Sequence, residues 1–593
     1  MNWIDQSPRL RGLLSLTHLS LLLTLGAGER PPNVIVILTD DQGWGDLSLN
    51  SNPNLKTPNI DSLAQEGAAF DRFFVCPVCS PTRAEFLTGR YHLRGGVYST
   101  SAGGERLDLD ERTIADAFRA QGYATGAFGK WHNGMQYPYH PNGRGFDYFY
   151  GFCSGHWGDY FSPPLEENGK LVTGTGFLVD DITDKAIDFI RQQEKAQKPF
   201  FAYLAYNTPH SPMQVPDPYW NRFKDKALKV RHREPERENI EHTRAALAMC
   251  ENIDWNVGRL NRELEALDLA PETIVVFFCD NGPNGSRWNG GMKGRKGSTD
   301  EGGVRSPLLI RWPGQIKPGL IIPQIAAAID LLPTLTDLAG FPAPRPKPLD
   351  GMSLKPLLLN HATTWPRRLI FSHWRNRTSV RSHQYRLDHE GRLFDLGKDP
   401  GQRTNLGDQA PEAFEALSQA LSSWKAALIP LSPPEFRPFP IGHPDAIYTQ
   451  IPARDGIPHG KIKRSNRFPN CSFFSNWTST DDYISWDTEV VEPGRFEVDL
   501  HYTCAPEDLG AELRLEWQGQ HLDVTITEAH DPPLRGAEHD RVKRIESYIK
   551  SFKPVRLGTI FLHPGRGSLE LRATKIPGKK AIDMRLLMFK RIP

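Results

Sequence analysis

The chain has 593 residues, a length that allows two or three domains and a large buried core. Its 71 lysines and arginines nearly cancel its 70 aspartates and glutamates, which excludes a global field that would draw it to nucleic acid or anionic lipid. Its seven cysteines are odd in number and scattered, which argues against a disulfide framework.

The N-terminal residues 1–28 are predicted to be an export signal. Arg9 and Arg11 precede the leucine-rich run of residues 13–25, and the small residues 26–28 are suited to cleavage. An ordered N-terminal helix or a wrongly assigned start codon is the alternative. No later stretch approaches the roughly 20 apolar residues that a membrane span needs. We therefore expect a soluble, secreted or periplasmic protein.

Two short stretches, residues 33–39 and 273–279, are continuously apolar and rich in β-branched residues, the pattern of a strand buried on both faces. Each is followed at once by two oxygen-bearing side chains, and these are Asp40, Asp41, Asp280 and Asn281. Either pair alone is more often a turn or a helix cap. Together they predict four ligands at the carboxyl edge of a parallel sheet, suited to Ca²⁺ or Mg²⁺ rather than zinc or copper.

The segment of residues 75–91 carries a cysteine at the start of a predicted short helix. Ser80 is predicted to cap this helix and Pro81 to be its first residue. Cys79 then lies just ahead of a helix N-terminus, where unpaired N–H groups and the helix dipole favour an anion. Arg83, one turn later, can point back at it. The combination indicates chemistry on an oxyanion ester.

The same segment has a second interpretation. Cys76 and Cys79 have the spacing of a redox pair or of half a zinc site. A zinc site needs a second pair of ligands, and the closely spaced candidate is Cys153 with His156. A redox pair usually opens a thioredoxin-like unit of far shorter length.

Two further predicted strands, residues 123–128 and 199–206, also end in polar groups. The chemically competent residues that follow them are Lys130, His132 and His210. A lone histidine after a strand is more often a satisfied loop residue, but here two strand ends contribute to one edge. Helical patterns at residues 112–121 and 180–197 alternate with the strands, which predicts a doubly wound sheet.

A glycine-rich, basic segment follows the second acidic pair, at residues 290–298, and contains Lys296. Glycine lets the backbone approach an anion and lysine supplies a point charge. A solvated basic loop is the alternative.

The C-terminal part changes character. Residues 385–387 and 392–396 are predicted antiparallel strands, followed by an amphipathic helix at 410–428 and a proline-rich linker. Beyond residue 446 the pattern is that of alternating strands, at residues 483–486, 494–502, 511–517 and 568–572. This predicts an antiparallel sandwich, similar to the jelly rolls of carbohydrate-binding modules. Its tryptophans, Trp477, Trp486 and Trp517, are as well suited to a core as to sugar binding.

The order Cys79-x-Pro81-x-Arg83, followed by Leu87-Thr-Gly-Arg90, resembles the signature of the formylglycine-dependent (type I) sulfatases, arylsulfatase-like members of the alkaline phosphatase superfamily. Thr82 and Phe86 stand where Ser and Leu are commoner, and Asn133 where Leu is. The other segments in the family's order are Asp40-Asp41, Gly-Lys130-Trp-His132, Pro-His210, Asp280-Asn281-Gly and Gly-Arg-Lys296-Gly-Ser-Thr-x-Glu-Gly-Gly. The resemblance covers roughly residues 31–428.

The resemblance implies a role for each matched residue. Cys79 would be oxidised by a maturation enzyme to formylglycine, whose hydrate is the nucleophile. The metal ligands would be Asp40, Asp41, Asp280, Asn281 and the modified Cys79, with Ca²⁺ (or Mg²⁺) as the cofactor. Arg83 and Lys130 would stabilise the hydrate, His132 would be the base for aldehyde release, and His210 and Lys296 would bind sulfate and assist the leaving oxygen. His156 is a candidate substrate contact.

The implied fold is a doubly wound, mostly parallel α/β sheet like that of alkaline phosphatase. The predicted division is a signal at 1–28, a catalytic domain at 29–365, a small antiparallel subdomain at 366–428, a linker at 429–445 and a β-sandwich at 446–593. The implied function is hydrolysis of sulfate monoesters, with sulfated carbohydrates as the preferred class. The alternatives are a phosphate or phosphonate monoester hydrolase of the same superfamily, and a non-catalytic glycan-binding protein in which Cys79 stays a thiol.

Overall fold

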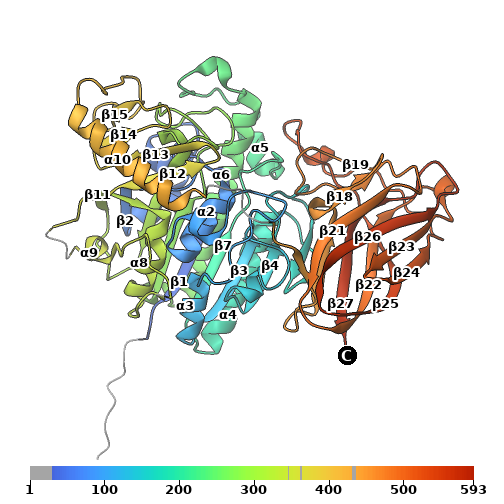
Figure 1. Cartoon of the computed structure of the whole chain (residues 1–593). Helices are drawn as coiled ribbons and strands as arrows, with labels where there is room; N and C mark the ends of the chain where they lie inside the picture. The colour runs from blue at the N-terminus through green and yellow to red at the C-terminus, as the bar shows by residue number, and fades with distance from the viewer. Residues whose placement is uncertain (1–29, 345, 361–363, 431–435) are drawn as a thin grey trace, which may run out of the picture.

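The computed structural model describes residues 30–344, 346–360, 364–430 and 436–593 (Figure 1). The predicted export signal at 1–28 lies outside these ranges, as does the centre of the predicted linker. Within them, no helix combines the length and apolarity needed to cross a bilayer.

The larger part of the molecule is built on a sheet of eleven strands among the described residues, in the order β11-β2-β10-β8-β1-β7-β3-β4-β5-β6 with β9 beside β2. β1, β3, β4, β7 and β8 are parallel to one another, and β11 is parallel to β2. Antiparallel pairing occurs at β10, β9 and the β5–β6 hairpin. The strands are β1 (Asn33–Thr39), β2 (Ala68–Phe74), β3 (Ala124–Lys130), β4 (Tyr148–Phe152), β5 (Pro164–Glu167), β6 (Lys170–Thr173), β7 (Phe200–Ala205), β8 (Thr273–Cys279), β9 (Arg305–Ser306), β10 (Leu308–Arg311) and β11 (Leu320–Ala327).

Helices cover both faces of this sheet. Alternate side chains of β1 enter two different cores, Ile35 on one face and Val34 and Val36 on the other, because successive strand residues point to opposite sides. The first core is shared with α1 (Pro58–Gln65), α4 (Leu178–Lys195), α5 (Asp217–Phe223) and α6 (Ile240–Ala266). The second is shared with α2 (Cys79–Thr88), α3 (Ile114–Ala120), α8 (Leu331–Leu338) and α9 (Lys355–Leu358). The doubly wound α/β prediction is confirmed.

The predicted subdomain is a four-stranded antiparallel sheet covered by α10 (Pro411–Leu428). Its strands are β12 (Ile370–Trp374), β13 (Arg377–Arg381), β14 (Tyr385–Leu387) and β15 (Leu393–Asp395). Tyr91, at the end of the segment of residues 75–91, packs edge-on against Trp424 of α10 with ring centroids 5.3 Å apart. This contact joins the small sheet and its helix to the larger domain.

The C-terminal part is a sandwich of two six-stranded sheets around one apolar core. The first contains β16 (Phe439–Ile441), β18 (Ile457–Pro458), β21 (Tyr483–Val490), β23 (Glu512–Trp517), β24 (Gln520–Thr525) and β26 (Gly565–Lys575). The second contains β17 (Tyr448–Pro452), β19 (Lys463–Arg464), β20 (Phe474–Ser475), β22 (Gly494–Thr503), β25 (Lys553–Leu562) and β27 (Asp583–Ile592). Trp477, Trp486 and Trp517 are at most 1% exposed, so they are core residues and not sugar platforms.

The segment predicted as a linker is partly a strand. β16 lies inside residues 429–445 and pairs in parallel with β21, so the sandwich begins before residue 446. β16 has three residues, all of them buried, and contains Pro440, so the sequence shows no alternating pattern there.

The sandwich lies against the side of the sheet that holds β4 and β5 (Figure 1). At the centre of the contact, Arg454 donates to Glu105 Oε1 at 2.6 Å and to Asp455 Oδ1 at 3.0 Å, and all three side chains are at most 1% exposed. Ser154 Oγ, from the loop after β4, accepts from Arg454 at 3.1 Å. A buried charge that loses its partner cannot be solvated by water instead. Ion pairs buried between two domains therefore indicate a fixed interface.

Replacing Arg454 by alanine should destabilise the protein by about 3–5 kcal/mol, because two buried carboxylates lose their partner. The measurement is denaturant unfolding followed by tryptophan fluorescence. Arg514→Ala is the control: Arg514 pairs with Asp523 on the surface of the same domain, and its removal should leave the transition where it is. Equal effects of the two variants would contradict a buried interdomain ion pair.

Candidate active site

The two predicted oxygen pairs meet at the carboxyl edge of neighbouring strands. Thr39 of β1 is in register with Cys279 of β8, so the residues that follow them lie side by side. Asp280 N donates to Thr39 O at 3.0 Å, and Asp41 N donates to Asp280 Oδ1 at 3.1 Å. Asp41 adopts a left-handed backbone with φ of 63°, which turns its side chain back over the edge.

The helix that carries the cysteine starts earlier than the sequence predicts. α2 begins at Cys79 itself with Val78 as its N-cap, so Ser80 is inside the first turn and is not the cap. Its hydroxyl instead accepts from Asn133 Nδ2 at 3.3 Å. Val78 is extended and supplies no side-chain oxygen to the helix N–H groups. Cys79 therefore occupies the first helical position, at the end favourable to negative charge.

Cys79 points at the acidic edge. Its sulfur and the carboxylate oxygens of Asp40 and Asp280 all lie within 4.8 Å of one another, and the residue is 3% exposed. Burial raises the pKa of the Cys79 thiol, although Lys130 and Lys296 oppose the shift. The prediction that the helix tip and both strand ends converge on one place is confirmed by this geometry.

Three cations from three different elements compensate the buried carboxylates. Lys130 Nζ, at the end of β3, lies 2.5 Å from Asp40 Oδ2. Lys296 Nζ, from the glycine-rich loop, lies 2.6 Å from Asp41 Oδ1. Burial alone would raise the pKa of Asp40, but Lys130, His210 and Arg83 hold it below its ordinary value.

The third cation is Arg83 on α2. It donates to Asp280 Oδ2 at 3.1 Å and to the Lys130 carbonyl at 2.7 Å, and its side chain is fully buried. Burial and the neighbouring Asp40 raise the pKa of Asp280 to about 7, with Arg83 and Lys130 opposing.

The oxygens left over at this edge fit a hard cation. Among the four predicted metal ligands that follow β1 and β8, three buried oxygens have no hydrogen-bond partner in the described part of the chain, and these are Asp40 Oδ1, Asp41 Oδ2 and Asn281 Oδ1. Asn281 Nδ2, by contrast, donates to Asp41 Oδ1 at 2.9 Å, so the amide oxygen is the atom directed to a ligand. Buried unpaired oxygens are costly, and a Ca²⁺ or Mg²⁺ ion is the group that would satisfy all of them together.

Two of the three predicted histidines are held in defined orientations. His132 has a left-handed backbone with φ of 68°, its Nε2 donates to Thr100 O at 2.9 Å, and its Nδ1 is unbonded. His210 Nδ1 donates to Ser211 O at 2.6 Å, which leaves Nε2 3.7 Å from Asp41 Oδ2. Burial lowers the pKa of both, with Lys130 acting on His132 and Lys296 on His210.

The remaining candidate, His156, lies beside His210, with ring centroids 5.5 Å apart, and neither of its ring nitrogens has a hydrogen-bond partner within the described residues. The zinc interpretation that joined Cys153 with His156 and Cys76 with Cys79 is wrong. Each cysteine belongs to a different group of potential ligands: Cys76 with Glu85 and His92, Cys79 with Asp40 and Asp280, and Cys153 with His140 and Glu166. All seven cysteines are free, so Cys76 and Cys79 form no disulfide in this structure.

One rim residue escaped the sequence analysis. Asn207 lies two residues after the end of β7, is 1% exposed, and neither its Oδ1 nor its Nδ2 has a partner among the described residues. The next carbonyl, that of Thr208, accepts from Asp40 N at 3.1 Å. Its position three residues before His210, at a strand end of the same edge, was the available signal.

Comparison with known proteins decides the family. A family model described as Sulfatase matches residues 32–341, slightly more than half of the chain. The chain belongs to the sulfatase family. A second model, N-sulphoglucosamine sulphohydrolase, C-terminal, matches residues 296–426 of this sulfatase, which includes the small antiparallel sheet.

Curated relatives agree. The sulfatase is 31% identical to N-acetylgalactosamine-6-sulfatase of Mus musculus over 70% of this chain and 90% of the relative. It is 34% identical to arylsulfatase A of Homo sapiens over 68% and 89%. Among solved structures, Ps i-CgsB in complex with k-i-k-neocarrahexaose superposes with a TM-score of 0.61 at 29% identity, covering 67% of this chain and 94% of that one. The protein is thus a sulfuric ester hydrolase.

Replacing Lys296 by alanine should lower kcat/KM for an aryl sulfate about 10²- to 10³-fold, because the family resemblance implies that this ammonium group binds the sulfate, and that preorganised charge is lost. Lys293→Ala is the matched control in the same loop: Lys293 lies 3.5 Å from Asp300 and 3.7 Å from Asp388, away from the edge. A change of less than about threefold is expected there. Similar losses in both variants would assign the effect to the loop and not to the ammonium group.

Proposed function

We propose that this sulfatase hydrolyses sulfate monoesters of carbohydrates through a formylglycine made from Cys79, with Ca²⁺ as its cofactor. The observation that carries the proposal is the position of Cys79 at the tip of α2, with Asp40 and Asp280 within 4.8 Å and three cations around them. The ligands of the ion would be Asp40, Asp41, Asp280, Asn281 and the modified Cys79. When bound, the ion supplies a Lewis acid toward a sulfate oxygen and orients the nucleophile.

An aldehyde hydrate has two hydroxyl groups, one to attack sulfur and one that, once deprotonated, expels sulfate and restores the aldehyde. His132 is suited to take that proton. Its Nε2–H is committed to Thr100 O, so the neutral ring presents Nδ1 as an acceptor. Lys130 and Arg83 neutralise developing negative charge on the hydroxyls.

His210 and Lys296 lie on the other side, both against Asp41. From there they would bind the sulfate oxygens, and one of them would protonate the leaving alcohol oxygen. The sulfur–oxygen bond to the alcohol breaks as the bond to the hydrate forms, and water regenerates the hydrate after sulfate has left.

Export and maturation fit the same scheme. Residues 1–28 would direct the chain to a secreted or periplasmic location. Cys79 is 3% exposed and belongs to a helix in which every residue is buried, so a maturation enzyme would have to act before this segment folds.

The carbohydrate assignment is supported by the relatives and by the sandwich. One relative is named for N-acetylgalactosamine 6-sulfate, and a solved one binds k-i-k-neocarrahexaose. In this chain the sandwich reaches the active site. Glu546 Oε1 accepts from Ser211 Oγ at 2.5 Å, one residue after His210, and Cys471 Sγ donates to His156 O at 2.8 Å.

A second contact lies beside the proposed base. A Cβ placed on Gly155 would fall 2.2 Å from His132 Nε2 and 2.8 Å from Asn470 Nδ2. Asn470 of the sandwich and His132 of the catalytic domain therefore approach each other across a position that only glycine can fill. Asn470 O also accepts from Ser154 Oγ at 2.9 Å.

The same sandwich loops, residues 465–471 and 541–547, also have solvent-exposed residues, Phe468 and Ile545 among them. Asn466 Nδ2 donates to Ile545 O at 2.9 Å and joins the two loops. Phe468 is 39% exposed under the guanidinium of Arg467, 4.7 Å from its ring centre. An aromatic face next to carboxylate and amide groups is suited to a sugar ring with its hydroxyls.

Mass spectrometry of the tryptic peptide of residues 73–83 from the exported protein should show an aldehyde in place of the thiol of Cys79. Cys79→Ala should abolish hydrolysis, by more than about 10³-fold, because the nucleophile is lost. A fully active enzyme with an intact thiol would contradict the proposal, and an inactive one would favour the glycan-binding alternative.

Glu546→Gln should raise KM for a sulfated oligosaccharide about tenfold, since it weakens a hydrogen bond from a sugar hydroxyl to a charged group. Turnover of a small aryl sulfate, which does not reach this loop, should stay unchanged. Glu538→Gln is the control, because Glu538 is an exposed carboxylate earlier in the sandwich sequence that accepts a hydrogen bond from Gly536 N. Loss of aryl sulfate turnover in Glu546→Gln would indicate disruption of the site and not of sugar binding.

A further inference from the structure

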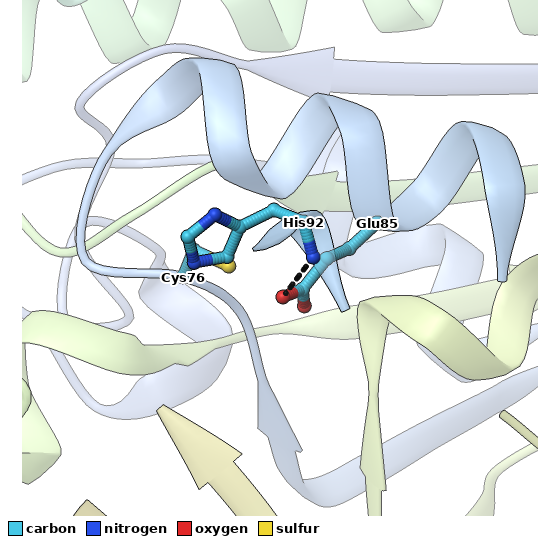
Figure 2. Close-up of side chains that lie close together, drawn as sticks. All are labelled: Cys76, Glu85 and His92. Atoms are coloured by element: carbon cyan, nitrogen blue, oxygen red, sulfur yellow. Dashed lines mark hydrogen bonds between the residues drawn. The ribbon is translucent and has the colours of Figure 1, made fainter. Parts of the chain in front are cut away.

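Behind the catalytic helix lies a second group of ligand-type side chains, Cys76, Glu85 and His92, hereafter the α2 trio (Figure 2). Cys76 precedes α2, Glu85 lies on its C-terminal half, and His92 follows its end. Their ligand atoms are all within 4.8 Å of one another, and the three residues are 3%, 4% and 3% exposed. Figure 2 shows the three side chains converging on one point, with the imidazole of His92 beside the sulfur.

The protonation state of His92 is fixed by its backbone contact. Its Nδ1 lies 2.6 Å from Val97 O, and a carbonyl only accepts, so Nδ1 carries the hydrogen. Burial lowers the pKa of His92, which keeps the ring neutral. Nε2 therefore bears a free lone pair. It is buried and has no hydrogen-bond partner among the described residues.

An unbonded ring nitrogen next to a thiol and a carboxyl group requires an explanation, since buried polar atoms are almost always satisfied. A ring whose Nδ1–H is held by a backbone carbonyl while Nε2 faces other ligands is the usual arrangement of a metal-binding histidine.

A comparison within the same chain shows that this arrangement is specific. His140, Cys153 and Glu166 form another buried trio. There Asn142 N donates to His140 Nδ1 at 3.3 Å, so the hydrogen is on Nε2, which lies 3.5 Å from Glu166 Oε2. That oxygen also accepts from Gln450 at 2.8 Å. His140 Nε2 also has no hydrogen-bond partner among the described residues, but this nitrogen carries the hydrogen and therefore offers no lone pair to a metal ion.

We propose that Cys76, Glu85 and His92 form a structural zinc site that clasps the two ends of α2. A thiolate, a carboxylate and a neutral imidazole are a normal zinc ligand set, and their two negative charges cancel those of Zn²⁺, so the buried site is neutral. Binding releases one proton from the thiol and one from the carboxyl group. A water takes the fourth tetrahedral position.

Two further acids, Asp350 and Asp330, act on Glu85, whose Oε1 also accepts a hydrogen bond from His92 N at 3.3 Å. The site is distinct from the proposed Ca²⁺ site, which uses oxygen ligands on the other side of α2, and zinc there would hold Cys76 and His92 in place on both flanks of Cys79 and Arg83.

The test is metal analysis of the full-length enzyme purified in millimolar calcium. We expect one zinc per chain, removed by a chelator selective for transition metals, with a lower Tm after removal and recovery on adding zinc. In Cys76→Ser and His92→Gln the zinc content should fall to less than about a tenth. His140→Gln, the matched variant in the second trio, should keep its zinc.

Cobalt gives an independent signature. Co²⁺ added to the zinc-free enzyme should produce a thiolate-to-cobalt absorption band that Cys79→Ser retains and Cys76→Ser loses. A folded wild-type enzyme that takes up neither zinc nor cobalt would overturn the proposal, whatever the variants do. So would a band that survives Cys76→Ser or zinc content that is equal in His92→Gln and wild type.

Discussion

The burial of three carboxylates at one edge of the sheet is the constraint on which the rest of this structure depends. Asp40, Asp41 and Asp280 are fully buried, and carboxylates so placed are tolerated only when cations compensate them. The compensating charges come from β3, from α2 and from the glycine-rich loop. Each of these elements must therefore reach the same few ångströms. The need to compensate these charges therefore accounts both for the active site and for the topology of the sheet around it.

The sequence predicted the inner part of this arrangement well. β1 and β8 are recovered to the residue, because a continuous apolar run between polar neighbours has only one way to be buried. Helix starts are less exact. α2 begins two residues before Pro81 because an extended Val78 serves as the N-cap without a side-chain hydrogen bond, a choice that leaves no compositional mark. α3 begins at Ile114, two residues late, because Thr113 and Asp116 form a capping box.

The outer part of the site could not be predicted in the same way. The contacts Ser211–Glu546 and Ser154–Asn470 join residues more than 300 positions apart, from domains with different secondary structure. The periodic spacing of apolar residues along a strand or a helix carries no information about such long-range pairs. The alternating strands predict a sandwich similar to carbohydrate-binding modules, and its tryptophans, which suited a core as well as sugar binding, are buried. The polar loops that approach His132 and His210 are a better basis for a role of the sandwich.

The helix that carries Cys79 accommodates both residues at which this chain departs from the family signature, Thr82 and Phe86. All ten residues of α2 are buried, so the helix is held by specific contacts on every side and not by one apolar stripe. Thr82 keeps the hydroxyl that serine would supply, donating to Asp280 O at 2.6 Å and accepting from Cys76 N at 2.9 Å. Phe86 fills the core between Tyr203 and Phe278, with ring centroids 5.3 and 5.6 Å away.

Glu85, on the same helix, is not explained by such packing contacts. A carboxyl group at a fully buried position, facing a thiol and an unbonded imidazole, has no cation among its hydrogen-bond partners, unlike the three carboxylates on the other side of the helix. A metal ion bound to the α2 trio would replace the proton on this carboxyl group and compensate its negative charge, as the cations do for the other three.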